Sequence, residues 1–148
     1  MKQVLSFEQM KHLKDLGVNT SDASMVLIAT DDDGCTLLWE DAEKAIKHHL
    51  YDVYFNLYYV ESSSYDHSFK KECGVFTLQD ILDKLPCFIG KEVLTIQKLA
   101  DSYTCLYMEY YTRSMIKITE SKELIDAAYD MLCWCIENGY VKVVMEEK

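Results

Sequence analysis

Three strand-like segments follow one another in the second half of the chain, separated only by short connections. Residues 92–99 and 103–111 are rich in β-branched and aromatic side chains, and residues 115–119 can supply a third strand. A polar turn signal at residues 100–102 separates the first two. Strand-like segments joined by short turns pair as neighbours in a sheet. The sequence therefore predicts an antiparallel meander, and the fold has to be built around it.

Helical patterns flank this meander, and each begins with a side chain that can cap a helix. Ser6 is followed three residues later by Gln9, which is the spacing of a capping box. Thr77 and Asp80 repeat this spacing, and Ser121 is expected to cap the most regular of the three helices. Residues that end helices follow the three patterns: Gly17, Pro86 and the pair Asn138 and Gly139.

A hairpin is predicted between the first two helices. Residues 25–29 and 35–39 are β-favouring segments, and they flank the acidic segment 31–34, which ends in Asp-Gly. An Asp-Gly pair between two apolar segments is the usual signature of a two-stranded turn. We therefore expect an N-terminal β-hairpin.

The segment that follows the hairpin is ambiguous. Apolar residues recur at helical spacing over residues 42–50, whereas residues 51–60 are rich in aromatic and β-branched side chains and predict a strand. One longer helix from Leu38 to Leu57 fits the same positions. Residues 61–72 have no apolar period and predict a loop. Both interpretations of the helix and strand stay open at this point.

Length and composition indicate a single globular domain. The chain has 148 residues, of which 49% are hydrophobic and 27% charged. A chain of this size can bury a core without metal or disulfide bonds. We expect one acidic α+β domain over residues 1–148, in which an antiparallel sheet, formed by the N-terminal hairpin and the C-terminal meander, packs with three to four helices as a single pair of layers.

The charge of the chain restricts its partners. Fifteen basic residues stand against 25 acidic ones, so the formal net charge is -10. Such a chain is not expected to bind nucleic acid or anionic lipid, and a basic protein is the partner that its charge favours. Six cysteines without a secretory signal indicate reduced thiols and a cytoplasmic protein, and no segment is apolar enough to span a membrane.

Two candidate metal sites lack a necessary ligand. A near-match to a calcium-binding loop is formed by Asp31, Asp33, Gly34 and Glu40, but Ala29 stands where the first carboxylate is needed. Cys133 and Cys135 are two positions apart on a predicted helix, so their side chains point about 200° apart and cannot bind one zinc ion together. The sequence therefore predicts neither metal nor cofactor.

Signatures of catalysis are also missing. The chain has no Gly-x-Ser-x-Gly motif, no family-specific cysteine motif and no glycine-rich phosphate loop after a strand. A small hydrolase or transferase would instead need a pocket that brings His48, His49 or His67 to a cysteine or an acid, with a perturbed pKa in that pocket. This enzyme is the alternative hypothesis for the chain.

Tyrosines on the predicted meander suggest a binding surface. Tyr103, Tyr107 and Tyr111 could line one surface of the sheet beside Glu109. Tyrosine offers a large contact area at a low entropy cost, which suits protein binding. Tyrosine is also common in half-buried sheets, so packing is the other explanation for the cluster.

Several segments resemble a known group of proteins. They are FTLQDILDKLP at residues 76–86, LIDAAYDMLCWCIENGY at residues 124–140, LSFEQM at residues 5–10 and TSDASM at residues 20–25. They are similar to small uncharacterised proteins of gut-bacterial genomes, often within prophage-like or other mobile elements. The resemblance implies a cytoplasmic, accessory role and assigns no functional residue.

The leading hypothesis is a non-enzymatic, intracellular protein-interaction domain with an acidic, tyrosine-bearing surface. A homo-oligomer formed through an exposed strand edge is a third hypothesis. Partner identity, oligomeric state and strand order do not follow from the sequence.

Overall fold

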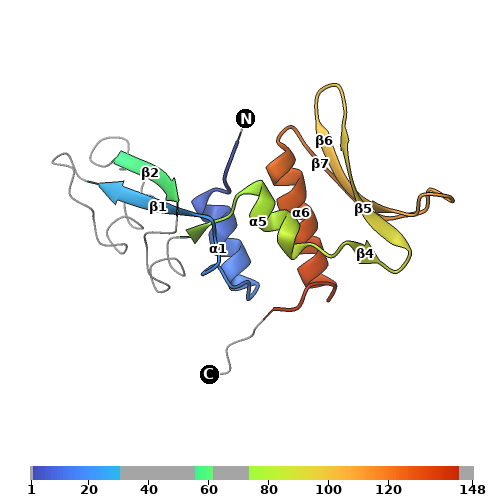
Figure 1. Ribbon diagram of the computed structural model, residues 1–148, viewed down its shortest axis with the longest axis horizontal. Coiled ribbons are helices and arrows are strands. Elements are labelled where there is room, and N and C mark those ends of the chain that lie inside the picture. The colour runs from blue at the N-terminus through green and yellow to red at the C-terminus, as the bar shows by residue number, and fades with distance from the viewer. Residues whose placement is uncertain (1, 31–55, 62–73, 144–148) are drawn as a thin grey trace. The chain divides into compact units, whose positions relative to one another are not determined.

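The structure, a computed structural model, describes residues 2–30, 56–61 and 74–143 (Figure 1). The chain divides into two compact units. Unit 1 consists of Met1–Asn19 and Phe76–Lys148, and unit 2 of Thr20–Val75, so unit 2 is inserted between the two parts of unit 1. That the whole chain forms one domain stays a prediction.

The two predicted capping boxes in unit 1 are confirmed. Helix α1 spans Phe7–Asp15, and the backbone N–H of Gln9 donates to Ser6 Oγ at 3.2 Å. Helix α5 spans Leu78–Lys84, and the N–H of Asp80 donates to Thr77 Oγ1 at 3.3 Å. In return, the side chains of Gln9 and Asp80 accept from the backbone N–H groups of Ser6 and Thr77. Each capping box therefore satisfies two backbone N–H donors at the start of its helix.

Helix α6 spans Leu124–Glu137, and its predicted start is wrong. Ser121 is the last residue of a strand, where it pairs with Tyr103, and its Oγ accepts from the N–H of Glu123 at 3.3 Å. Glu123 is the capping residue, and its side chain makes no capping hydrogen bond. Pairing within the sheet holds Ser121 in an extended conformation, so the helix begins two residues later than a cap at Ser121 would place it.

The end of α6 is the predicted Schellman motif. The N–H of Tyr140 donates to Cys135 O at 2.8 Å, and that of Gly139 donates to Ile136 O at 3.1 Å. Gly139 has a φ of 77°, in the left-handed region that this motif requires and that glycine tolerates best. The same pattern ends α1, where Gly17 has a φ of 94°.

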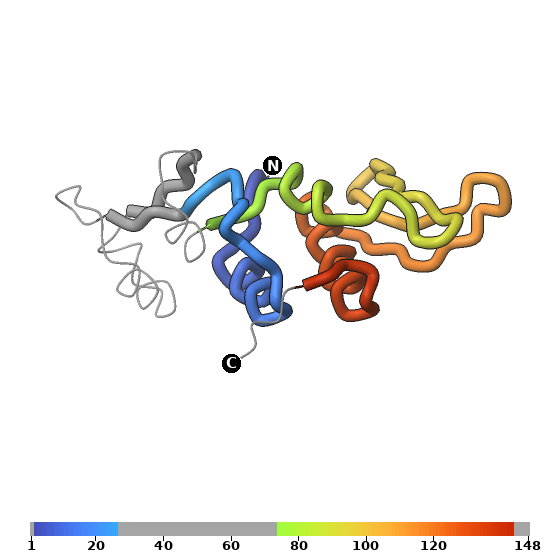
Figure 2. The backbone as a smooth tube through the Cα atoms, turned by 60° about the horizontal axis from the view of Figure 1, so that its bottom comes forward, coloured from blue at the N-terminus to red at the C-terminus, as the bar shows by residue number. Residues whose placement is uncertain are grey.

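The meander is confirmed as a four-stranded antiparallel sheet in the order β4-β5-β6-β7, whose strands are labelled in Figure 1 and whose chain path is the green-yellow to orange part of the tube in Figure 2. Its strands are Phe88–Ile89, Glu92–Lys98, Tyr103–Met108 and Met115–Ser121. Strand β4 was not predicted, because a strand of two residues is too short to show the alternation of side chains that identifies a strand. Strand β6 ends at Met108 rather than at residue 111, and the register between β6 and β7 shifts beside Tyr107 and Met108.

Unit 2 contains a three-stranded antiparallel sheet in the order β2-β1-β3. Its strands are Met25–Thr30 (β1), Asn56–Glu61 (β2) and Gly74–Val75 (β3). The first strand of the predicted hairpin is therefore confirmed, but its described partners are β2 and β3. Leu57 lies in β2, so the longer helix reaching Leu57 is wrong. Residues 31–55 and 62–73, with the predicted hairpin turn and second strand, the helix at 42–50 and most of the loop, lie outside the described residues.

A network of polar side chains joins the two parts of unit 1 that are distant in the sequence. Lys2 Nζ donates to Asp126 Oδ1 and to Gln9 Oε1, each at 2.8 Å, and Gln9 Nε2 donates to the same Asp126 oxygen at 2.9 Å. This network joins the N-terminal segment, α1 and α6. The α+β fold class is confirmed, but β1 of the predicted hairpin and the meander belong to two separate antiparallel sheets rather than to one. No helix in the described ranges is long and apolar enough to cross a membrane.

Candidate functional site

The two faces of the β4–β7 sheet have different surroundings. Helix α6 covers one face, because Thr119 Oγ1 donates to Ala127 O of α6 at 2.7 Å. Cys105 and Tyr107 lie on the same face, are fully buried, and interact with Cys135 of α6. Alternate residues of a strand point to opposite faces, so the residues between them point away from α6.

This second face, which we call the outer sheet face, carries an apolar row across all four strands. Phe88 pairs with Val93, Val93 with Met108, and Met108 with Met115. Phe88 is 63% exposed and Met115 is 54% exposed. Because paired residues point to the same side of a sheet, Phe88, Val93 and Met108 lie next to one another, and Met115 pairs with Met108 where the register shifts.

The outer sheet face becomes polar away from this row. In the next row, Thr95 pairs with Leu106, which is fully buried, and Leu106 pairs with Ile118, which is 49% exposed. The third row consists of the polar residues Gln97, Thr104 and Glu120. The exposed apolar side chains are therefore concentrated at one end of the sheet.

The turn between β6 and β7 adds two exposed aromatic rings at that end. Tyr110 and Tyr111 are 78% and 90% exposed, and their rings meet edge to face at a centroid distance of 5.6 Å. We call residues 109–114 the tyrosine turn. It joins Met108 to Met115, so it lies directly beside the apolar row. The N–H of Glu109 donates to Ser114 O at 2.8 Å and closes the turn.

The four residues predicted to share a binding surface do not share one. Tyr107 is fully buried, and its hydroxyl donates to Pro86 O at 2.7 Å. Tyr103 is partly buried on the face that α6 covers, and Glu109 is partly buried in the tyrosine turn. Only Tyr111 is widely exposed. The predicted alternation fails because β6 ends at Met108 and because α6 covers the odd-numbered side chains of β6.

Other residues form the exposed surface, and the sequence did not identify them. They are Phe88, Tyr110, Met115, Ile116 and Ile118. Alternation shows that a strand has two faces, but it does not show which apolar face is covered. The sequence held one sign of an exposed apolar surface, namely the apolar residues Met115, Ile116 and Ile118 on neighbouring positions of a short strand, which cannot all point to the same buried face.

The sheet is electrically neutral in spite of the acidity of the chain. Residues 88–121 contain four basic and four acidic side chains, so their net charge is zero: Lys91, Lys98, Arg113 and Lys117 against Glu92, Asp101, Glu109 and Glu120. The acidic character predicted for a tyrosine-bearing surface therefore belongs to other parts of the chain.

Among the described residues, titratable side chains gather in a pocket of about 510 Å³ between α1, α6 and β7. It is lined by His12, Lys117, Thr119, Glu120, Tyr129, Asp130, Cys133, Trp134 and Glu137. The rings of His12 and Tyr129 are 6.4 Å apart. His48, His49 and His67, which the enzyme hypothesis named, lie outside the described residues.

The electrostatics of this pocket do not favour a cysteine nucleophile. Burial raises the pKa of the Cys133 thiol to about 11. The hydrogen bond with Tyr129 lowers this pKa, whereas the nearby charges of Glu137 and Asp130 raise it further. A thiol with this pKa is protonated at neutral pH and is a weak nucleophile. Burial, with the nearby charge of Asp126, also raises the pKa of Asp130. Over the described part of the chain, no three His, Cys, Asp or Glu side chains are placed to hold a metal ion.

Comparison with known proteins adds no assignment. No protein-family model, no curated protein and no solved structure matches the chain significantly. The outer sheet face and the pockets of unit 1 are therefore the basis on which a function can be inferred.

Proposed function

We propose that this chain is a non-enzymatic protein-interaction domain that binds its partner through the outer sheet face and the tyrosine turn. The observation that carries the proposal is the apolar row from Phe88 to Met115, whose two end residues are more than half exposed. Contiguous exposed apolar patches mark interaction sites in water-soluble proteins, whereas single exposed apolar residues do not.

The composition of this surface matches that of a protein interface. Its exposed members are phenylalanine, tyrosine, methionine and isoleucine side chains, and aromatic residues and methionine are enriched where proteins bind one another. Fully burying one such side chain contributes roughly 1.5–3 kcal/mol. Phe88, Tyr111 and Met115 are each largely exposed, so a partner that covers them gains much of this free energy at each residue.

The charge of the sheet defines the partner. Because residues 88–121 are neutral, the partner that fits is a protein with an apolar patch of its own rather than a strongly basic one. Binding should then depend weakly on salt. A basic partner, favoured by the net charge of the whole chain, would have to bind elsewhere, for example at α6, where residues 122–137 contain one basic and four acidic side chains. A cytoplasmic accessory role, as in mobile elements, is part of the same proposal.

Paired surface variants test the proposal. The chain and its Phe88→Ser/Met115→Ser variant would be used to capture partners from native lysate at low and high salt. Leu99→Ser is the matched control, because Leu99 is 44% exposed and follows β5 at the opposite end of the sheet. Substitutions at such exposed positions should change stability by no more than about 0.5 kcal/mol, which thermal unfolding would verify.

The proposal expects one discrete protein that the wild type and Leu99→Ser capture at both salt concentrations and that the double variant loses. Equal capture by all three forms would remove the outer sheet face from consideration. Capture that vanishes at high salt would point to the basic partner instead. A mass above one chain in solution, abolished by the double variant, would show that the partner is a second copy.

A further inference from the structure

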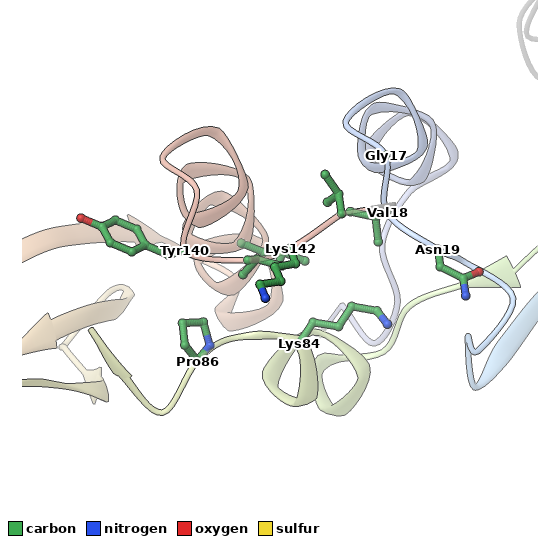
Figure 3. A pocket seen from close by; sticks show the side chains of 10 residues that line it. Gly17, Val18, Asn19, Lys84, Pro86, Tyr140 and Lys142 are labelled. Atoms are coloured by element: carbon green, nitrogen blue, oxygen red, sulfur yellow. The ribbon is translucent and has the colours of Figure 1, made fainter. Parts of the chain in front are cut away.

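The three helices of unit 1 all end at one pocket, on residues that the proposed interaction surface does not use (Figure 3). Gly17, Val18 and Asn19 follow α1, Lys84 and Pro86 stand at the end of α5, and the segment 140–143 follows α6. The pocket has a volume of about 380 Å³. Pockets for small molecules usually have volumes of about 300–1,000 Å³, so this one is large enough for a small ligand.

The walls of the pocket are mainly apolar. Leu132 of α6 is fully buried and forms part of the wall. The other apolar lining residues are Val18, Pro86, Tyr140, Val141 and Val143. Two left-handed glycine turns shape this wall, because Gly17 and Gly139 reverse the chain directly before Val18 and Tyr140. Tyr140 is also fixed by its ring, which lies 5.3 Å from that of Trp134.

The charged groups of the pocket are all positive. Lys84 and Lys142 line it together with Asn19, and no aspartate or glutamate is among its described lining residues. In a chain with 25 acidic and 15 basic residues, such a lining is unlike the average surface. Figure 3 shows the two lysine side chains in the space between Pro86 and Asn19. Apolar walls with a few placed polar groups are the usual design of a small-molecule site.

We infer that this pocket binds a small amphipathic anion, a molecule with an apolar chain or ring and one carboxylate or phosphate group. The apolar part would lie against Val18, Leu132 and Val141, and the anionic group would lie near Lys84 and Lys142. Lysine ammonium groups attract both carboxylates and phosphates as point charges.

The two lysines have another explanation, which the experiment has to separate. Three helix C-termini bring partial negative charge to this region, and lysines near such ends stabilise them. Lys84 lies in the last turn of α5, and its ammonium group is 4.8 Å from the centre of the Phe76 ring. If the lysines serve only the helix ends, replacing them should change stability and leave ligand binding unaltered.

Titration of the ¹⁵N-labelled full chain with octanoate, octyl phosphate and octylamine tests the inference. We expect octanoate or octyl phosphate to give saturable shifts of the backbone amides of Gly17, Val18 and Val141, and octylamine to give none. The stronger of the two anions identifies the headgroup. Equal shifts with octylamine, or shifts confined to Phe88 and Met115, would overturn the inference.

A charge variant completes the test. Lys84→Gln/Lys142→Gln should weaken binding of the better anion about 10-fold, since each exposed ion pair contributes modestly. Lys91→Gln is the matched control, because Lys91 is an exposed lysine in the turn between β4 and β5. Unchanged affinity in the double variant, with a lower unfolding midpoint, would assign the lysines to the helix ends alone. Neither result bears on the outer sheet face.

Discussion

Replacing Tyr107 with phenylalanine should destabilise unit 1, although this residue was predicted to lie on a binding surface. The side chain is fully buried, and its hydroxyl donates to Pro86 O at 2.7 Å. Phenylalanine keeps the ring and removes only the hydroxyl, so packing against Cys105 and Cys135 is preserved. The substitution therefore removes the interactions of this hydroxyl alone: the hydrogen bond from β6 to the end of α5 and the hydrogen bond with the Cys135 thiol of α6.

The magnitude follows from the surroundings of the two groups. A hydrogen bond between neutral groups contributes about 0.5–1.5 kcal/mol net, and a partner left without water costs more. Pro86 is only partly buried, so water can reach its carbonyl oxygen in part. We expect Tyr107→Phe to lower the free energy of unfolding by about 1 kcal/mol.

Urea unfolding, followed by circular dichroism and by tryptophan fluorescence, measures this change. With a slope of about 2 kcal/mol per molar urea, the midpoint should fall by about 0.5 M at an unchanged slope. Tyr111→Phe is the control, because Tyr111 is 90% exposed and should show no shift. The reasoning is refuted if both variants shift equally, or if Tyr107→Phe unfolds at the wild-type midpoint.

Two further predictions concern the stability of unit 1. The Thr104 hydroxyl is buried on the outer sheet face and has no hydrogen-bond partner among the described residues. Thr104→Val should therefore stabilise the fold by about 1 kcal/mol, since burying an unpaired hydroxyl costs roughly 1–3 kcal/mol; a lower melting temperature would show that the hydroxyl is paired. The carboxylate of Asp126 is partly buried, which raises its pKa, but hydrogen bonds from Gln9 and Lys2 and the charge of Lys2 outweigh this and lower the pKa overall. Because its folded pKa lies below its unfolded value of about 3.9, Asp126 stabilises the fold above that pH, and the contribution is lost as the pH falls through the folded pKa. The stability difference between the wild type and Asp126→Asn should thus be constant from pH 7 to about pH 5 and shrink below about pH 4; a difference that persists at pH 2 would contradict it.

Sequence was sufficient where the determining contacts are local. A capping box needs two residues three positions apart, so Ser6 with Gln9 and Thr77 with Asp80 could be identified without knowledge of the fold. A left-handed helix end needs one glycine, which Gly139 supplies. Ser121 shows the limit of this reasoning, because pairing with Tyr103 in the sheet keeps it extended and moves the helix start to Leu124.

The candidate sites depend on contacts between residues far apart in the chain. Alternation divides β6 into two faces, but only tertiary packing decides that Tyr107 is buried against α6 and that, on the other face, Leu106 is buried while Met108 stays partly exposed. Strand β1 pairs with residues 56–61 and 74–75. Both segments are distant from β1 in the sequence, so no local turn signal could reveal these pairings.

The sequence by itself determined the three helices of unit 1, the caps of α1 and α5, and the meander, because each depends on residues a few positions apart. Tertiary structure decided which apolar face stays exposed, which tyrosine reaches solvent, and that three helix ends from residues 17, 86 and 140 meet at one pocket. The physical reason is that burial is a property of what packs against a side chain, and the packing partners here come from distant parts of the chain.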